Sequence, residues 1–527
     1  MSTTADVVVA GAGHNSLIAA AYLARSGREV LILEEQDVLG GGAVTEELLG
    51  PGYLIDSCST GHTLIQGNPL LADDELGLRS EQGLTYVDPD PVAHVVFPDG
   101  ESFTMWLDVE RTVAGFARFC PADAEAYRRM QREWAEVRGV FRSNLFTPVG
   151  TGPSVDDTLR ATPSGRVWLR RKALSAWQVI SHEFTDPHVQ AFVCWQASQT
   201  LVALDAPGSG VLAYSIMAGR QARSWSIPRG GSGQLTDALV RVIEAAGGTA
   251  LTGRRVTELI VDAGRCVGVR TGDGEEFRAR EAVLSTIHVR HLLDMAPREL
   301  WGEDFVYGVE TLDVGLPAYV VYLGTTAAPA FTTTDGTGSA VSAGWAGWPE
   351  DVIDATTRIR RGHADPDFPW ALVATPSLVD DRRAPAGHHT VKILHPQSHL
   401  PPKGETWDEA KPRFTAGLLD RLRAIAPNMT ADVITAELAR SPDDIAAANA
   451  HMIDGTFHGG DRATPFADAL RPAPGWAQHR MPIPGLYQTG GTTHPGGSIT
   501  GAPGRNAAQV MLRDLGTSIG EVIAAGR

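Results

Sequence analysis

The chain has 527 residues, and its 62 acidic residues outnumber 45 basic ones, which gives a formal net charge of −17. This length exceeds what one small core can organise and predicts two or three domain-sized units, while the negative charge argues against nucleic-acid binding through a basic surface. With 43% hydrophobic and 20% charged residues, the composition excludes a mainly disordered or coiled-coil chain.

The first forty residues predict a strand, a glycine turn, a helix and a second strand. Residues 6–10 form a short valine-rich run, typical of a strand buried in a parallel sheet. Gly11 and Gly13 follow, and then residues 17–25 carry apolar side chains at helical spacing. A second β run over residues 29–33 leads directly to Glu34. This order predicts dinucleotide binding.

Each residue type in this unit has a physical role in holding a dinucleotide. Gly11 permits the tight turn, and Gly13 lets the backbone approach a pyrophosphate at the helix N-terminus. Ser16 replaces the usual third glycine and is small enough to keep helix and strand close. Glu34 can accept a hydrogen bond from a ribose 2′-hydroxyl, which argues against NADP. A βαβ unit that binds nothing is the alternative interpretation.

A second glycine turn follows Glu34 closely and favours a longer, folded cofactor over NAD. The runs GAGHNSLIAAAYLARSG, VLILEE and LGGGAVTEE resemble the FAD-binding start of the phytoene desaturase superfamily. The nearest resemblance is to desaturase-type carotenoid ketolases and to pyridine-nucleotide-disulfide-oxidoreductase-domain proteins. The resemblance implies non-covalent FAD, contacted here by Gly11, Gly13, His14, Asn15, Ser16, Glu34, Glu35, Gly41, Gly42, Ala43 and Ser59.

A middle segment extends the resemblance. Residues 227–236 contain a PRGG loop and open a helix that we expect to run to about residue 246. A strand over residues 255–261, a hairpin turn at Asp273 and Gly274, and a further strand at residues 282–286 follow. This order is similar to the family's middle FAD segment, and the resemblance implies that the backbone at Val256 contacts the adenine.

The C-terminal segment also resembles the family. A strand ends in glycines at residue 490, a second glycine-rich stretch follows, and a helix then runs to about residue 515. In the family this turn and helix N-terminus meet the flavin, where their partial positive charge favours the reduced form. We expect Gly497 to have a strained backbone and to approach the isoalloxazine. The implied FAD contacts are Gly490, Gly491, Gly497, Ser498, Ile499 and Thr500.

The order of these segments predicts an α/β fold. A Rossmann-type FAD-binding domain, discontinuous in sequence, comprises residues 1–70, 220–300 and 480–527. An inserted α+β substrate or cap domain comprises residues 71–219 and 301–479. No second nucleotide fingerprint is present, so we expect no NAD(P)H domain, and the electrons should pass to oxygen, a quinone or the organic substrate.

The inserts should hold the substrate. Of the 12 tryptophans, only Trp225 lies in the three FAD segments, which suggests a pocket for an apolar or ring-bearing molecule. Trp345 and Trp348 flank glycines and are the aromatic candidates, although tryptophans here can equally fill a core. Lys392 is a further candidate, because flavin amine oxidases hold a lysine near flavin N5 through a water; a pocket-rim lysine is the alternative.

Two histidines are the catalytic candidates. His494 lies beside the C-terminal glycine turn, and His62 follows the first FAD segment, so either could orient substrate or move a proton. Each could instead hydrogen-bond a backbone carbonyl. The sequence has no HxH or HExxH pattern, and we predict no metal site.

These patterns predict an FAD-dependent oxidoreductase that removes a hydride from a hydrophobic or ring-bearing small molecule by dehydrogenating a C–C or C–N bond. A carotenoid ketolase or desaturase, a redox-neutral flavin-dependent isomerase and a non-enzymatic flavoprotein are the alternatives. The four cysteines are widely spaced, which predicts a reducing, cytoplasmic location. No apolar stretch approaches twenty residues, so we expect no transmembrane segment, and a peripheral membrane contact stays open.

Overall fold

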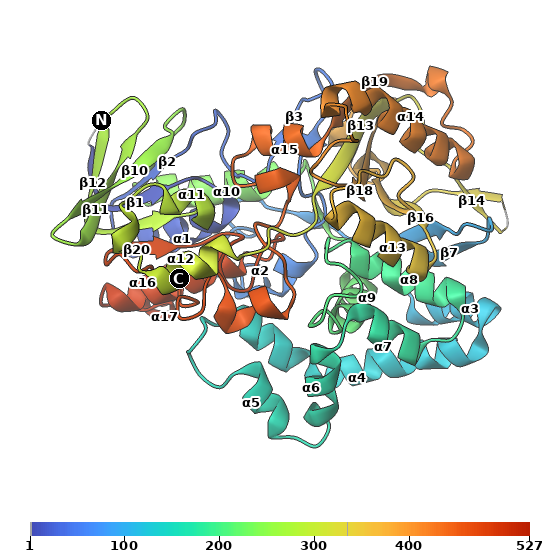
Figure 1. The fold of residues 1–527 in the computed structure, drawn as a ribbon, viewed down its shortest axis with the longest axis horizontal. Helices are drawn as coiled ribbons and strands as arrows, with labels where there is room; N and C mark the ends of the chain where they lie inside the picture. The colour runs from blue at the N-terminus through green and yellow to red at the C-terminus, as the bar shows by residue number, and fades with distance from the viewer. Residues whose placement is uncertain (1–2, 335, 527) are drawn as a thin grey trace.

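Two seven-stranded sheets organise the chain, whose computed structural model describes residues 3–334 and 336–526. The first sheet has the order β10-β11-β12-β1-β2-β9, with β20 also paired to β12. Figure 1 shows it on the left, built from strands near both chain ends and from the middle of the chain. Its strands are β1 (Thr4–Ala10), β2 (Val30–Leu33), β9 (Thr249–Leu251), β10 (Val256–Asp262), β11 (Arg265–Thr271), β12 (Glu276–Ser285) and β20 (Leu486–Gln488).

The N-terminal βαβ unit has the predicted form. β1 pairs in parallel with β2, with Val7 opposite Val30, and both strands are almost entirely buried. The helix between them, α1 (His14–Arg25), is rich in small apolar side chains and packs closely against α10 (Gly233–Ala245) and α16 (Ala502–Asp514). Apolar burial on both faces of the parallel strands therefore explains their continuous apolar sequence.

β12 differs from the prediction. The sequence suggested a hairpin strand followed by a separate strand, whereas residues 276–285 form one strand. Its first part pairs antiparallel with β11, and its last part pairs in parallel with both β1 and β20. The burial pattern changes from alternating to continuous along the strand, because only the second part lies in the sheet interior.

The second sheet has the order β19-β13-β18-β17-β16-β6-β7 and lies on the right of Figure 1. One face packs on α14 (Trp407–Ile425), through side chains such as Trp407 and Phe414. The opposite face packs against the helices of residues 109–223 and faces the first sheet's glycine turns. The strands are β6 (Ala93–Val96), β7 (Ser102–Met105), β13 (Ala318–Thr325), β16 (Ser342–Ala346), β17 (Trp370–Ala374), β18 (His389–Pro396) and β19 (Ile434–Arg440).

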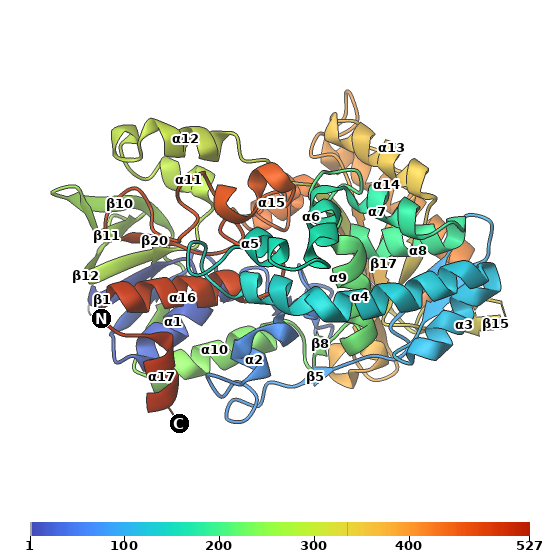
Figure 2. The same cartoon turned by 90° about the horizontal axis from the view of Figure 1, so that it is seen from below.

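A layer of helices connects the parts of the molecule that contain the two sheets. Figure 2 shows the long helix α4 (Pro121–Leu145) running from the part with the second sheet toward α16. The side chains of Asn506 and Arg505 donate to the carbonyls of Leu145 and Phe146, which fixes the end of α4 on α16. The other helices of this layer are α3 (Val109–Phe119), α5 (Val155–Arg160), α6 (Gly165–Ala173), α7 (Ala176–Glu183), α8 (Pro187–Ser198) and α9 (Leu212–Arg223).

Shorter elements complete the fold. None of the helices in residues 3–334 and 336–526 is both long and apolar enough to cross a membrane. These elements are β3 (Thr45–Glu46), β4 (Ile55–Asp56), α2 (Pro69–Ala72), β5 (Tyr86–Val87), β8 (Ile227–Pro228), α11 (Val289–Leu293), α12 (Glu303–Glu310), β14 (Phe331–Thr333), β15 (Gly336–Gly338), α13 (Pro349–Arg360), α15 (Pro442–Ala448) and α17 (Ile519–Ala525).

The two sheets draw on different parts of the sequence. Strands of the first sheet all come from the segments predicted to bind FAD, and strands of the second all come from the inserts. The packing does not follow the predicted boundary at residue 300 everywhere. Phe305 and Val309 of α12 lie beyond this boundary but pack on the first sheet. The domain boundaries themselves stay a prediction.

Candidate active site

One large cavity lies where the parallel strands of the first sheet end. Residues directly after β1, β2, β12 and β20 line it, and its far wall is formed by the second sheet and by α9. Its volume is about 600 Å³. Ligands of open α/β sheets bind at the carboxyl ends of the strands, so the topology alone marks this cavity as the functional site.

The N-terminal turn is built around backbone contacts. Gly11 has φ +90°, and a Cβ placed on it would lie 2.7 Å from Cγ2 of Thr286. A Cβ on Gly41 would lie 3.1 Å from Cα of Gly13, so the two glycine turns touch each other. Side chains would fill this cradle. The first residues of α1 line the cavity and its first turn carries no acid, which leaves the helix N-terminus open to an anion.

Glu34 lies at the end of β2 and faces the same cavity. Its carboxylate accepts hydrogen bonds from the backbone N–H groups of Ala12, at 2.7 Å, and Gln36, at 3.0 Å. Burial raises the pKa of this carboxyl, although both N–H groups oppose the shift. Glu34 therefore orders the turn, and its contact with a ribose stays a prediction. Its neighbour Glu35 is exposed and pairs with Arg255 at 3.5 Å.

The C-terminal turn converges on the same point. Gly490 has φ +98°, and a Cβ placed on it would lie 2.6 Å from Oγ1 of Thr286, the side chain that also crowds Gly11. Segments almost 500 residues apart in the chain thus meet on a single threonine. The predicted FAD contacts that line the cavity are Gly11, Gly13, His14, Asn15, Glu34, Glu35, Gly41, Gly42, Ser59, Val256, Gly490, Gly491, Gly497, Ser498 and Ile499.

Three predicted contacts lie behind this surface. Ser16 is fully buried, and its hydroxyl donates to the carbonyls of Gly11 and Gly13. Ala43 and Thr500 are also buried and are absent from the cavity lining. These three residues therefore pack behind the glycine turns instead of facing the cavity. A small residue at position 16 was expected to allow such close packing of helix and strand.

Gly497 is required for a different reason from the one predicted. Its φ lies outside the left-handed region, whereas Gly496 (φ +107°) and Ser498 (φ +82°) are inside it. A Cβ on Gly497 would lie 2.3 Å from the carbonyl oxygen of His458. The glycine therefore permits close packing against His458, and the strained residue of the turn is Ser498.

Two arginines, one of them fully buried, hold the C-terminal turn in place. Arg471 is fully buried and donates to backbone carbonyls, including those of Gly491 and Asp461. Arg462 donates to the carbonyl of Gly497 at 2.7 Å. Burial lowers the pKa of Arg471 to about 9 and that of Arg462 to about 10. The sequence analysis did not identify them, because nothing local links them to the turn they clamp.

Both predicted catalytic histidines lie outside the cavity. His494 Nε2 donates to the carbonyl of Asn144 at 3.0 Å and so binds the end of α4. His62 is fully buried, with Nε2 2.6 Å from the hydroxyl of Ser232 and Nδ1 3.2 Å from that of Tyr86. His494 thus bonds a backbone carbonyl, the alternative left open by the sequence, whereas His62 bonds two side-chain hydroxyls. Because neither histidine lines the cavity, we do not carry them forward as catalytic residues.

The two predicted pocket tryptophans are also in the core. Trp345 packs in the cluster between the second sheet and α14. Trp348 stacks on Phe97 with ring centroids 6.3 Å apart and contacts His188 edge-on. The tryptophan that does line the cavity is Trp225, which lies within an FAD segment and packs on Gly61. Concentration of tryptophan in the inserts therefore reflects core filling.

Lys392, the third substrate candidate, lines the cavity. It projects from β18 into the cavity wall, and its Nζ donates to the carbonyls of Asp56 and Cys58. Burial lowers its pKa, although the nearby Cys58 and Asp56 oppose the shift. Burial likewise raises the pKa of the Cys58 thiol to about 11. Lys392 is thus held by neutral carbonyls rather than paired with a carboxylate.

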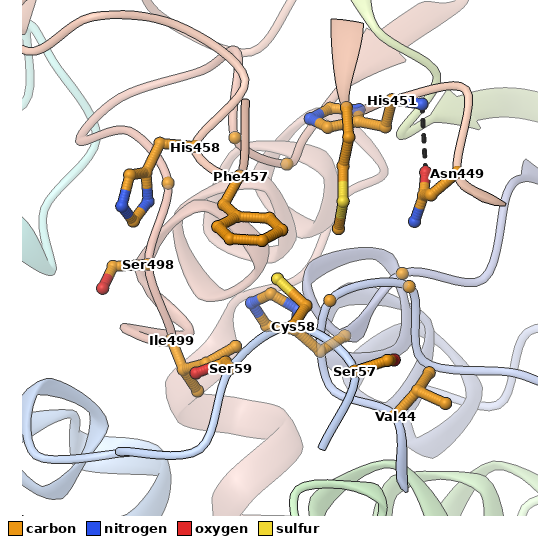
Figure 3. A pocket seen from close by; sticks show the side chains of 18 of the residues that line it. Val44, Ser57, Cys58, Ser59, Asn449, His451, Phe457, His458, Ser498 and Ile499 are labelled. Carbon is orange, nitrogen blue, oxygen red and sulfur yellow. Dashed lines mark hydrogen bonds between the residues drawn. The ribbon is translucent and has the colours of Figure 1, made fainter. Parts of the chain in front are cut away.

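Figure 3 shows side chains that the sequence analysis missed. Phe457 lies in the cavity between His458 and His451, and Cys58 points toward it from the opposite side. His451 Nδ1 donates to the carbonyl of Thr286, while His458 Nδ1 is buried without a hydrogen-bond partner in the described part of the chain. The available signal was the FHGG run at residues 457–460, which has the histidine–glycine character of the recognised turns.

Comparison with known sequences identifies the family. Residues 17–512 match the family described as flavin containing amine oxidoreductase. The chain belongs to this family. It is an FAD-dependent oxidoreductase, as the sequence predicted, and the glycine cradle, the open α1 N-terminus and Glu34 fit that cofactor. Among the described residues, no cluster of histidine, cysteine and acidic side chains is arranged to hold a metal ion.

Several known proteins are similar over nearly their whole length. The chain is 28% identical to pyridine nucleotide-disulfide oxidoreductase domain-containing protein 2 of Mus musculus, covering 97% of this chain and 94% of that one. It is 28% identical to a limonene dehydrogenase chain of Castellaniella defragrans (99% and 97% covered). It is 26% identical to a lycopene-forming phytoene desaturase of Paracoccus sp. (97% and 98% covered). The predicted likeness to phytoene desaturases is confirmed.

Solved structures confirm the predicted fold class. Putrescine oxidase has a TM-score of 0.61 at 13% identity, with 99% of each chain covered. Cyclohexylamine oxidase from Brevibacterium oxydans has a TM-score of 0.59 at 16% identity, with 97% of this chain and 99% of the other covered. At these identities the likeness concerns the fold alone.

Proposed function

We propose that the protein dehydrogenates a C–C or C–N bond of a hydrophobic small molecule and passes the electrons to oxygen or a quinone. The observation that carries the proposal is the single cavity that joins both glycine turns to an apolar wall. Leu201 and Ile216 line that wall from the helical layer, and Leu372, Leu394 and Phe457 line it from the second half of the chain. The named substrates of two relatives, limonene and phytoene, are hydrocarbons and support an apolar ligand.

The chain's own residues have distinct tasks in this reaction. Bound FAD would supply a two-electron acceptor with flavin N5 as the hydride-accepting atom. The turns at Gly11 and Gly490 would hold the cofactor, and the sheet face carrying Leu372 and Leu394 would exclude water from the reacting bond. Lys392, whose pKa is lowered by burial, can hold a proton or a water molecule at the cavity wall.

Anaerobic addition of substrate tests the proposal. Purified holoprotein would be mixed with a panel of terpenoids, hydrophobic acids and hydrophobic amines, and flavin absorbance would be followed. Bleaching by at least one compound, with a desaturated or oxidised product, is the expected result. Product formed only after prior reduction of the flavin, with no net bleaching, would favour the isomerase instead. Inertness toward every compound would favour a non-enzymatic flavoprotein.

The electron acceptor is tested in the same experiment. Substrate-reduced protein would be mixed with air-saturated buffer or, anaerobically, with a soluble quinone. Rapid return of flavin absorbance with one of them identifies the acceptor, and failure with both would contradict this part of the proposal.

A further inference from the structure

A buried arginine lines the substrate end of the cavity without a carboxylate partner. Arg220 lies in the last turn of α9 and is only 6% exposed. Its guanidinium donates to the amide oxygen of Gln199 and, at 3.4 Å, to the hydroxyl of Ser342. No acid contributes to its environment, and burial lowers its pKa to about 9. Both of its hydrogen-bond partners are neutral, and its Cζ also lies 5.5 Å from the ring centroid of Trp225. The guanidinium is therefore desolvated without a carboxylate to balance its charge.

Space for a ligand lies directly beside this guanidinium. Ser215, Ile216, Gly219 and Arg220 share one face of α9, and all four line the cavity. A Cβ placed on Gly219 would meet no atom within 4 Å. The helix therefore presents Arg220 next to an open surface rather than against packed side chains.

The second sheet continues this surface toward Lys392. Ser342, which accepts from Arg220, is paired with Ala374, and Ala374 is paired with Lys392 on the next strand. Side chains in register on neighbouring strands project from the same face. Ala374 and Lys392 both line the cavity. Arg220 and Lys392 thus lie at two ends of one row, with apolar side chains of the next row, Leu372 and Leu394, beside them.

The charges on this wall favour an anion. The second sheet and α9 contribute three cationic side chains to the cavity, Arg220, Lys392 and Arg440. Of the acids that line the cavity, Glu34 and Glu35 belong to the nucleotide turn, Asp294 follows α11, and Glu46 lies in β3. An ammonium group would meet the unbalanced guanidinium, and a pure hydrocarbon would leave it unpaired.

We propose that the substrate is a hydrophobic carboxylic acid whose carboxylate is bound by Arg220, with Gln199 orienting the guanidinium. This inference rests on the proposed dehydrogenase function and names its substrate class. A carboxylate matches the planar guanidinium fork and supplies the missing counter-charge. The apolar wall of Ile216, Leu372 and Leu394 then holds the hydrocarbon part of the molecule.

The test is a binding titration of the FAD-loaded protein with three probes of equal chain length: decanoate, decan-1-ol and decylamine. Binding is measured by perturbation of the flavin spectrum, so it does not depend on turnover. The variants are Arg220→Met, which removes the charge, and Arg220→Lys, which retains it. Arg223→Met is the matched control, because Arg223 lies on the same helix but is exposed.

Wild-type protein should bind decanoate at least tenfold more tightly than decanol, and decylamine most weakly. Arg220→Met should remove the preference for decanoate while keeping full FAD content and unchanged affinity for decanol. Arg220→Lys should keep part of the preference, and Arg223→Met should behave as wild type.

Four results would overturn the inference. An equal preference in wild type and Arg220→Met would show that Arg220 does not bind the carboxylate. Loss of FAD from Arg220→Met would place Arg220 on the cofactor. If decanol binds but decanoate has no advantage, the substrate class falls while the dehydrogenase function stands, whereas failure of all three probes to bind would also remove the hydrophobic site proposed above.

Discussion

The two ends of the cavity are built in different ways. At the end where we expect the nucleotide, the lining is mostly glycine backbone with one acid, from residues close together in sequence such as Gly11, Gly13 and Glu34. At the substrate end, side chains such as Arg220 and Lys392 come from a helix and a sheet that only the tertiary fold brings together. A backbone site leaves a local sequence pattern, whereas a side-chain site assembled from distant elements does not.

The largest effect should come from crowding the backbone end. Gly11→Val adds a branched side chain where φ is +90° and where Cβ alone would lie 2.7 Å from Thr286. Strain and displacement together should cost about 3 kcal/mol or more, on the order of a 100-fold loss of FAD affinity. The variant should elute from gel filtration without FAD. Its circular dichroism should remain that of wild-type apoprotein, and full FAD content would contradict the proposed cradle.

A smaller loss should follow removal of the acid. Glu34→Ala deletes the carboxylate that we expect to accept a hydrogen bond from the ribose, and it frees the N–H groups of Ala12 and Gln36. We expect a cost of roughly 1.5–3 kcal/mol, or about 10- to 150-fold in FAD affinity, measured by titrating apoprotein. Asp37→Ala is the matched control, because this nearby carboxylate is exposed and does not line the cavity, and it should change affinity far less. An equal loss of FAD affinity in the two variants would contradict the assignment of Glu34 as the residue that binds the ribose.

The end of the cavity at the glycine turns should also respond to acid. Burial lowers the pKa of His14 and of His451, whose ring lies against Gly459 and Gly491, from 6.5 to about 4. The unfolded chain takes up these protons first, so the free energy of unfolding should fall as the pH decreases from 6.5 toward 4, by about 1.4 kcal/mol per pH unit for each histidine.

Urea unfolding of the apoprotein at several pH values checks this. His451→Gln should reduce the slope by about one proton, while His182→Gln, a change at an exposed residue, should leave it unchanged. A slope that is the same in wild type and His451→Gln would show that His451 is protonated in the folded state.

The smallest effect on the site should come from the core tryptophans. Trp348→Leu removes the stacking on Phe97 and should lower the free energy of unfolding by about 1–3 kcal/mol without changing substrate affinity. Trp225→Leu should in addition weaken substrate affinity, because Trp225 is buried and also lines the cavity. Thermal unfolding and flavin-perturbation titration of both variants measure the two quantities. A weaker substrate affinity in Trp348→Leu would contradict its core role and show that Trp348 contributes to substrate binding.

The predictions from sequence succeeded where the chemistry is local. The strand–turn–helix–strand unit and the hairpin at Asp273 need only nearest neighbours in the chain, and both have the predicted form apart from the unbroken β12. Trp345 and Trp348 were assigned from composition, which cannot distinguish a core from a pocket. No sequence motif surrounds Arg220. It became a candidate because no acidic side chain contributes to its environment, and only the folded structure shows this.

Filling the substrate end of the cavity tests the central claim most directly. Gly219 lies inside α9 with open space where its Cβ would be, so Gly219→Phe can place a ring in the cavity without crowding the backbone, and replacing a helical glycine should not weaken the helix. With any compound that reduces the wild-type flavin, anaerobic stopped-flow measurement should show full FAD content and at least a tenfold slower reduction in Gly219→Phe, with Gly219→Ala close to wild type. Normal reduction of the flavin in Gly219→Phe would contradict the claim that substrate and cofactor share this cavity.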